Sequence, residues 1–203
     1  MTDGLQTLKD KYEHIMLNPA KVEGELFQFV MSTFSYKKIS KGGLYNIIPY
    51  EIQRAGLKFG KELKSFPKTI KNTHVYYFND DNQILLIEVY GQNESIVNRN
   101  YYFYEGNTIE SIYFNSGTKS VRNITLLKKE NGKIYETISY GAFGCNISAY
   151  FYQKDELIEI DVQQKEHENE GFSCYKVLFE YKNNSLEKIC YKHPNGYEEQ
   201  RYP

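Results

Sequence analysis

From His74 to Tyr202 the chain repeats one pattern: an aromatic or aliphatic run, a polar turn, and a second apolar run. The turns consist mainly of Asn, Asp and Gly, residues that tolerate a positive φ or hydrogen-bond their own backbone. The runs before the turns are Val75–Phe78, Tyr101–Tyr104, Ile124–Leu127, Tyr150–Tyr152 and Val177–Tyr181. The unit returns at roughly 25-residue spacing, which is typical of repeat architectures. The pattern therefore predicts hairpins in series.

Short runs rich in Tyr, Phe, Ile and Val and bounded by turn residues are typical of β-strands. Links this short join antiparallel neighbours, because a parallel connection needs a much longer crossover. We therefore expect about five tandem hairpins over residues 71–203, forming a large antiparallel meander with a last strand from Tyr197 to Tyr202. Both faces of Tyr101–Tyr104 are aromatic, and we expect one face to lie on a core and the other to be half exposed.

Residues 1–70 show helical rather than alternating periodicity. Apolar residues from 5 to 17 form one helical stripe. Asn18 is expected to cap a second helix and Pro19 to open it. A third helix is expected to start at Pro49. These stripes need a partner surface, so we predict an α+β fold of two or three N-terminal helices packed on the meander, with residues 1–203 in a single domain.

One hairpin pattern runs through Phe179–Leu186, followed by Pro194–Tyr197 and Arg201–Tyr202, and Tyr102–Ile109 is a weaker second copy. This pattern resembles the tyrosine-containing YD repeats of Rhs-type and teneurin-type shell proteins. That family places Tyr-Asp before the turn and Gly-Arg-Leu after it, whereas this chain has Tyr-Lys and Ser-Leu, so the likeness is mainly one of hairpin geometry. Similar tandem hairpins occur in small immunity proteins of bacterial polymorphic toxin systems. The resemblance therefore implies an immunity or inhibitor function.

Composition excludes several classes of function. The formal net charge of -1 creates no global field that would favour nucleic acid or membranes. No apolar run approaches the roughly 18 residues of a membrane helix, and Met1–Gly4 opens no targeting peptide, so we expect a cytoplasmic protein. Cys145, Cys174 and Cys190 have unpatterned spacing and are expected to be reduced thiols. Without a P-loop, Rossmann or zincin motif, we predict no cofactor, no metal and no enzyme.

Charge is unevenly distributed along the chain. Residues 37–71 are rich in Lys and Arg, and residues 155–170 are rich in Asp and Glu. This pattern indicates a basic helical end and an acidic hairpin end, although ordinary solvated faces produce the same pattern. The side chains expected to bind a partner are Asp155, Glu156, Glu159, Asp161, Glu166, Glu168, Tyr150 and Tyr152.

A rigid sheet with an exposed tyrosine-rich face is a contact surface of low conformational entropy. An acidic hairpin beside it would complement a basic partner, such as a nuclease domain, and speed association. We therefore expect a non-enzymatic protein-binding module, most concretely an immunity protein or inhibitor that binds and blocks a toxin. The oligomeric state is left open.

Two alternatives use other residues. Lys58, Lys61 and Lys64, interleaved with aromatic residues, would suit a nucleic-acid-associated or phage accessory protein. An enzyme would need Cys145 as nucleophile with His167 or His193 as base. Nothing in the spacing brings those groups together. Three consecutive residues from Glu166 to Glu168 rarely converge on one metal ion.

Overall fold

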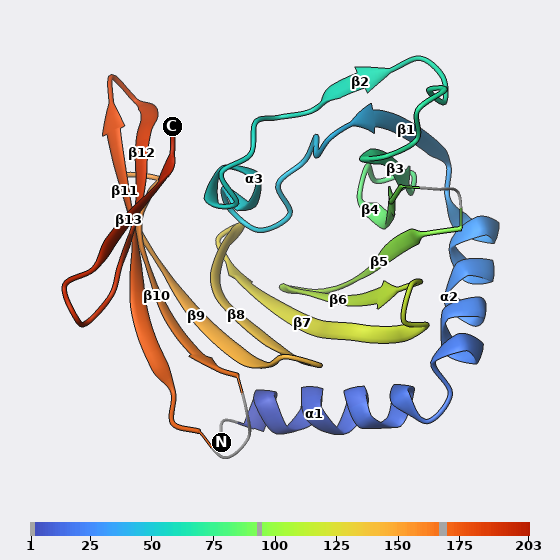
Figure 1. Cartoon of the computed structure of the whole chain (residues 1–203), viewed down its shortest axis with the longest axis horizontal. Coiled ribbons are helices and arrows are strands. Elements are labelled where there is room, and N and C mark those ends of the chain that lie inside the picture. Colours follow the sequence, from blue (N-terminus) through green and yellow to red (C-terminus); the bar gives the residue numbers. More distant parts are fainter. Residues whose placement is uncertain (1–2, 93–94, 167–169) are drawn as a thin grey trace.

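The computed structural model describes residues 3–92, 95–166 and 170–203, and folds them into three helices and one 13-stranded antiparallel sheet (Figure 1). The helices are α1 (Asp3–Met16), α2 (Pro19–Thr33) and α3 (Glu51–Arg54). The strands are β1 (Tyr36–Lys41), β2 (Lys61–Leu63), β3 (Thr73–Phe78), β4 (Ile84–Tyr90), β5 (Val97–Glu105), β6 (Thr108–Asn115), β7 (Ser120–Glu130), β8 (Lys133–Gly141), β9 (Gly144–Gln153), β10 (Glu156–Lys165), β11 (Ser173–Lys182), β12 (Ser185–Lys192) and β13 (Glu198–Tyr202).

The sheet is a curled meander. From β3 to β13 the strands lie side by side in chain order, and β1 and β2 extend the sheet beyond β3. The predicted combination of N-terminal helices with a large antiparallel sheet is confirmed. The finer description as about five tandem hairpins is wrong, because each hairpin also hydrogen-bonds to the next one and the strands form one long open sheet.

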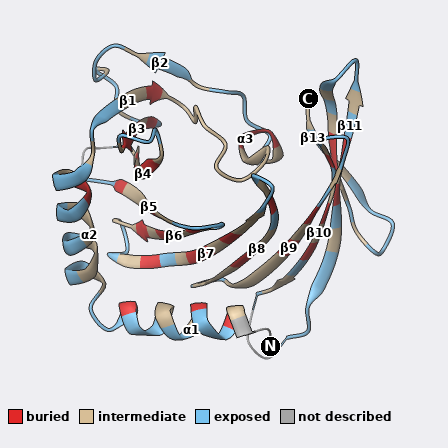
Figure 2. Cartoon of the chain, turned by 180° about the vertical axis from the view of Figure 1, so that it is seen from behind, coloured by how far each residue is buried: buried red, intermediate tan, exposed pale blue. Residues whose placement is uncertain are grey.

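The curl gives the sheet two different faces. The inner face curves around the segment 42–60, which contains α3, and the outer face carries α1 and α2 (Figure 1). Alternate side chains of a strand point to opposite faces, so most strands contribute to two cores. Tyr102 packs in the inner core and Tyr101 in the outer core, and both are buried. Figure 2 shows buried positions along the strands of the curled sheet and on α1. The predicted half-exposed face is therefore wrong at Tyr101 and Tyr102, which lie on opposite faces and are both buried, whereas Phe103 and Tyr104 are partly buried.

The first two helices form as predicted. The side chain of Asn18 accepts a hydrogen bond from the Lys21 N–H at 3.4 Å, and Pro19 is the first residue of α2. The third helix is only one turn long, because Gly56 adopts a φ of +70° two residues after α3 and turns the chain away. Residues 36–41 and 61–63 form strands that were not predicted; β1 pairs with β3, and β2 is the edge strand beyond β1. No helix among the described residues is long and apolar enough to cross a membrane.

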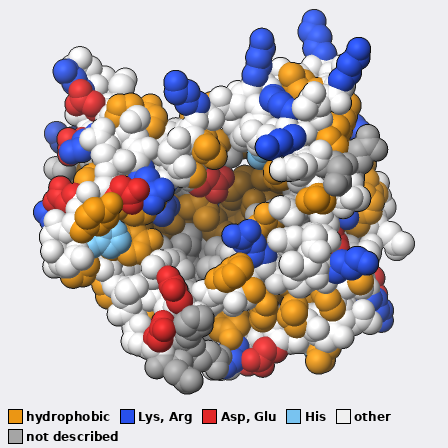
Figure 3. Space-filling model, in the orientation of Figure 1, with side chains coloured by type: hydrophobic (Ala, Val, Ile, Leu, Met, Phe, Trp, Pro, Cys, Tyr) orange, Lys and Arg blue, Asp and Glu red, His pale blue; other side chains and the backbone are white. Residues whose placement is uncertain are grey.

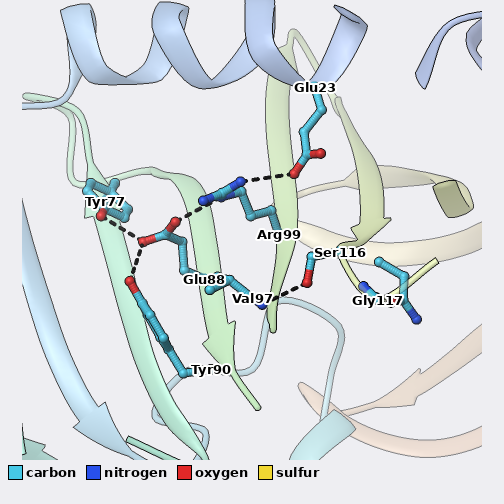
Figure 4. A network of polar contacts seen from close by, with 9 residues as sticks. Glu23, Tyr77, Glu88, Tyr90, Val97, Arg99, Ser116 and Gly117 are labelled. Atoms are coloured by element: carbon cyan, nitrogen blue, oxygen red, sulfur yellow. Dashed lines mark hydrogen bonds and ion pairs between the residues drawn. The ribbon is translucent and has the colours of Figure 1, made fainter. Parts of the chain in front are cut away.

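A buried polar network fastens α2 to the outer face of the sheet (Figure 4). The Arg99 guanidinium donates to Glu88 at 2.8 Å and to Glu23 of α2 at 3.1 Å. The Glu88 carboxylate also accepts from the Tyr77 hydroxyl at 2.9 Å and the Tyr90 hydroxyl at 3.4 Å. Burial raises the pKa of Tyr77, and the neighbouring Glu88 raises it further. The network thus joins β3, β4, β5 and α2 around the buried carboxylate of Glu88.

Candidate functional site

The two rims of the sheet are built differently. Successive turns of an antiparallel meander fall alternately on opposite rims. The tight-turn rim carries residues 79–83, 106–107, 131–132, 154–155 and 183–184, where positive φ values recur. The long-loop rim carries residues 91–92, 95–96, 116–119, 142–143, 166, 170–172 and 193–197. Because loops on a rigid scaffold commonly carry function, the long-loop rim is the stronger candidate.

Exposed apolar side chains distinguish the long-loop rim. Ile96, Phe143, Phe172 and Tyr197 are all exposed there, and Phe143 retains 75% of its accessible surface. The turns of the opposite rim contain only Asn, Asp, Gly, Gln and Lys. Grouped exposed apolar residues are typical of interaction sites. These four residues were not predicted, although a large apolar residue in each of four alternate connections was a visible signal.

Cations stack on two of these phenylalanines. The Arg122 guanidinium lies 5.6 Å from the ring centre of Phe143 and 5.7 Å from that of Tyr113. Lys165 lies 6.0 Å from the ring centre of Phe172. A β-bulge between β6 and β7 makes Arg122 the extra residue and so re-aims its side chain. Aromatic and arginine side chains are the residue types that most often dominate binding energy at interfaces.

The inner face contains a cavity beside α3. Its volume is about 450 Å³, and it lies between the inner face of β3–β6 and the segment 42–58. Figure 3 shows this region as a hollow at the centre of the molecule with hydrophobic side chains on its floor. The polar groups that line it include Glu51, His74, Asn100 and Tyr102. The cavity is within the size range of small-molecule sites.

Hydrogen bonds in this cavity are arranged around Tyr76. Its hydroxyl accepts from the Leu44 N–H at 2.8 Å and lies 3.3 Å from Nδ1 of His74, whose Nε2 lies 3.1 Å from Oδ1 of Asn72. Burial lowers the pKa of His74 to about 4. Burial raises the pKa of Glu51, and hydrogen bonds from backbone N–H groups to its carboxylate partly offset this rise. At neutral pH the imidazole is therefore uncharged.

The buried imidazole predicts a pH dependence of stability. The folded protein resists protonation of His74 down to about pH 4, whereas the unfolded chain binds this proton near pH 6.5. Stability is thus fully present above pH 6.5 and falls as the pH drops toward 4, by about 3 kcal/mol. Urea denaturation of wild type and His74→Gln across this range should show the wild type losing more stability toward acid. Parallel curves would contradict the assignment.

A row of uncharged polar side chains crosses the inner face. Thr125 donates to Ser139 at 3.0 Å, and Asn123 donates to Ser139 at 3.2 Å. The row consists of register partners from β5 to β11, namely Tyr102, Ser111, Thr125, Ser139, Asn146, Gln164 and Ser173. It leads from the first cavity to a second one of about 450 Å³ at the long-loop rim, lined by Ser139, Asn146 and Gln164 among others. The face between the cavities therefore offers hydrogen bonds without charge.

The structure separates the candidate catalytic residues. Cys145 lines the second cavity, whereas His193 stacks on Tyr175 with ring centres 5.3 Å apart and lines a third cavity. His167 lies outside the described residues. Cys145, Cys174 and Cys190 form no disulfide bond. Within the described parts of the chain, no group of three His, Cys, Asp or Glu side chains could hold a metal ion.

The residues predicted to bind a partner do not share one surface. Asp155 pairs with Lys133 on the tight-turn rim, and Glu156 starts β10 there. Glu159 and Asp161 pair with Lys176 at 2.6 and 3.2 Å. Glu166 lines the second cavity, and Glu168 lies outside the described residues. Tyr150 and Tyr152 face inward, where their hydroxyls lie 3.2 Å from that of Thr137 and 2.9 Å from the Ile134 carbonyl oxygen.

The alternative basic site stays together in the structure. Lys58, Lys61 and Lys64 are all exposed and follow the free edge of the sheet at β2.

No protein-family model and no curated protein matches the chain.

Proposed function

We propose that this chain is a non-enzymatic protein-binding module that engages its partner with the long-loop rim. In its most concrete form it is an immunity protein or inhibitor that covers the active site of a toxin. The observation that carries the proposal is the set of exposed apolar side chains on that rim, Ile96, Phe143, Phe172 and Tyr197.

The geometry of the rim suits a cleft-shaped partner surface. Each of these four residues directly precedes a paired strand, so little conformational entropy is lost when its side chain docks. Phe143 projects from the β8–β9 turn with Arg122 beside it, and this pairing matches the aromatic and arginine anchors of known interfaces. A row of loops with projecting aromatic side chains can enter an active-site cleft and block it.

The acidic residues contribute less than the rim to this proposal. Glu159 and Asp161 are partly neutralised by Lys176, and Asp155 by Lys133. Exposed ion pairs of this kind contribute little to affinity and mainly tune association rates. A basic partner, such as a nuclease domain, could still be steered by these carboxylates, whereas the rim would supply the affinity.

Substitution of the rim aromatics tests the proposal. A partner captured by the wild-type chain in its producing organism should bind the double variant Phe143→Ser/Phe172→Ser at least about 30-fold more weakly, since truncated anchors commonly cost 2 kcal/mol or more. The measurement is the dissociation constant by calorimetry, together with inhibition of the partner's activity.

The matched control replaces exposed aromatics elsewhere. Phe151 and Phe172 are both 45% exposed, and Tyr135 is 44% exposed, but Phe151 and Tyr135 lie on strands away from the long-loop rim. The variant Phe151→Ser/Tyr135→Ser should bind as wild type does. If both double variants bind equally well, or if both lose the partner, the long-loop rim is not the interface.

A further inference from the structure

The segment from residue 57 to 71 concentrates unpaired positive charge along the free edge of the sheet. We call this segment the basic edge; its lysines are Lys58, Lys61, Lys64, Lys68 and Lys71, all exposed. None of them forms an ion pair within the described part of the chain. The segment contains one carboxylate, Glu62, which lies 3.8 Å from Lys38 on β1. Figure 3 shows blue side chains gathered above the region where Figure 1 places β2.

Many lysines elsewhere on the molecule form ion pairs. Lys128, Lys176 and Lys188 lie 2.5 to 3.0 Å from Glu136, Glu159 and Glu180, respectively. Other lysines with carboxylate partners include Lys21, Lys182 and Lys192. The basic edge differs because five lysines without such a partner among the described residues follow one another within 15 residues. Like charges held close together repel one another, and an anionic ligand relieves that repulsion.

Aromatic and apolar side chains lie among these lysines. Phe59 is 54% exposed and Leu57 is 60% exposed. Phe66 is also exposed, and its ring packs edge to face on Tyr90 with centroids 5.0 Å apart, which holds the ring in place. The basic edge thus combines cations with accessible ring faces.

We propose that the basic edge binds a single-stranded polynucleotide. Lysines neutralise backbone phosphates, and exposed aromatic rings stack on bases regardless of sequence. A single strand fits better than a duplex, because only unpaired bases offer their faces to Phe59 and Phe66. This site is separate from the long-loop rim and does not depend on the protein-binding function.

Two other anionic partners fit the observations less well. A membrane-bound segment presents a continuous apolar face, whereas here lysines separate Leu57, Phe59 and Phe66 along the chain. Insertion into lipid also needs a ring that can leave the protein surface, and Phe66 is held by Tyr90. An acidic peptide would use the charge but would leave the exposed rings without a partner.

The test is fluorescence anisotropy of the full chain with labelled oligothymidylate at several salt concentrations. We expect the affinity to fall steeply with salt. It should decrease at least about tenfold in Lys58→Glu/Lys61→Glu/Lys64→Glu and severalfold in Phe59→Ala. The control Lys119→Glu/Lys129→Glu/Lys154→Glu makes the same change in net charge on β7 and on the β6–β7 and β9–β10 turns, which are not neighbours of β2 in the sheet. It should keep most of the affinity, and circular dichroism should show every variant folded.

Several outcomes would overturn the proposal. Absence of binding at low salt would do so directly. Equal loss in both triple variants would show a general charge effect rather than a site. If Phe59→Ala binds as tightly as wild type does, and polyglutamate competes as well as oligothymidylate, the basic edge is a polyanion surface without base stacking. Preferential binding to phosphatidylserine vesicles would assign the basic edge to membranes.

Discussion

Replacing Arg99 by alanine should destabilise the fold by about 3 to 5 kcal/mol, because it leaves a buried carboxylate without its cation. The Glu88 side chain is only 4% exposed, and Arg99 is its ion-pair partner at 2.8 Å. The hydroxyls of Tyr77 and Tyr90 would remain as hydrogen-bond donors, but neither carries charge. Urea denaturation monitored by tyrosine fluorescence measures the loss.

Two controls separate burial from simple loss of an ion pair. Lys21→Ala removes an exposed ion pair with Glu25 on α2, the helix that the network contacts, and should cost no more than about 0.5 kcal/mol. Replacing Arg99 and Glu88 together by leucine should restore part of the stability lost in Arg99→Ala, since no buried charge then remains. If Arg99→Ala costs no more than Lys21→Ala, the network does not hold α2 to the sheet.

Replacing Gly144 by alanine should cost at least about 3 kcal/mol, through a steric clash added to backbone strain. Gly144 has a φ of +93°, and a Cβ there would lie 1.8 Å from the Lys165 carbonyl oxygen. The β8–β9 hairpin and β10 would have to separate to admit it. Because this hairpin carries Phe143, partner binding should weaken along with stability. Thermal unfolding and the binding assay measure the two effects.

Gly132→Ala is the matched control for the clash. Gly132 has a comparable φ of +79°, but no atom lies within 4 Å of the position that a Cβ would take. Its replacement should cost only the conformational strain, roughly 1 kcal/mol. The difference between the two variants therefore measures how tightly β8–β9 packs on β10. Equal costs would mean that Gly144 is required for its φ alone.

The elements that local sequence encodes were predictable. Asn18 and Pro19 mark the start of α2 because capping and a fixed φ act within one turn of chain. The turns at Gly106–Asn107 and Asn183–Asn184 were predictable for the same reason, since positive φ favours these residues wherever they occur. The short apolar runs between such turns then had to pair as antiparallel neighbours.

The candidate site was predicted less well. Tyr150 and the acidic residues after it are close in sequence, but alternate strand positions send Tyr150 to the inner face and Asp161 to the outer face. The distinction between the two rims was also missed, because it depends on comparing connections across the whole meander. Phe143 and Phe172 stand out only when their loops are placed on one rim.

By itself, the sequence determined the start of α2 and the strands and turns of the meander, because these depend on backbone preferences and hydrophobic periodicity over a few residues. Only the tertiary structure decided that the sheet curls around α3, that β1 and β2 extend its edge, and which charges are paired. Those features arise from packing and hydrogen bonds between segments far apart in the chain. At such positions, tertiary packing overrides the helix or strand preference of the local sequence.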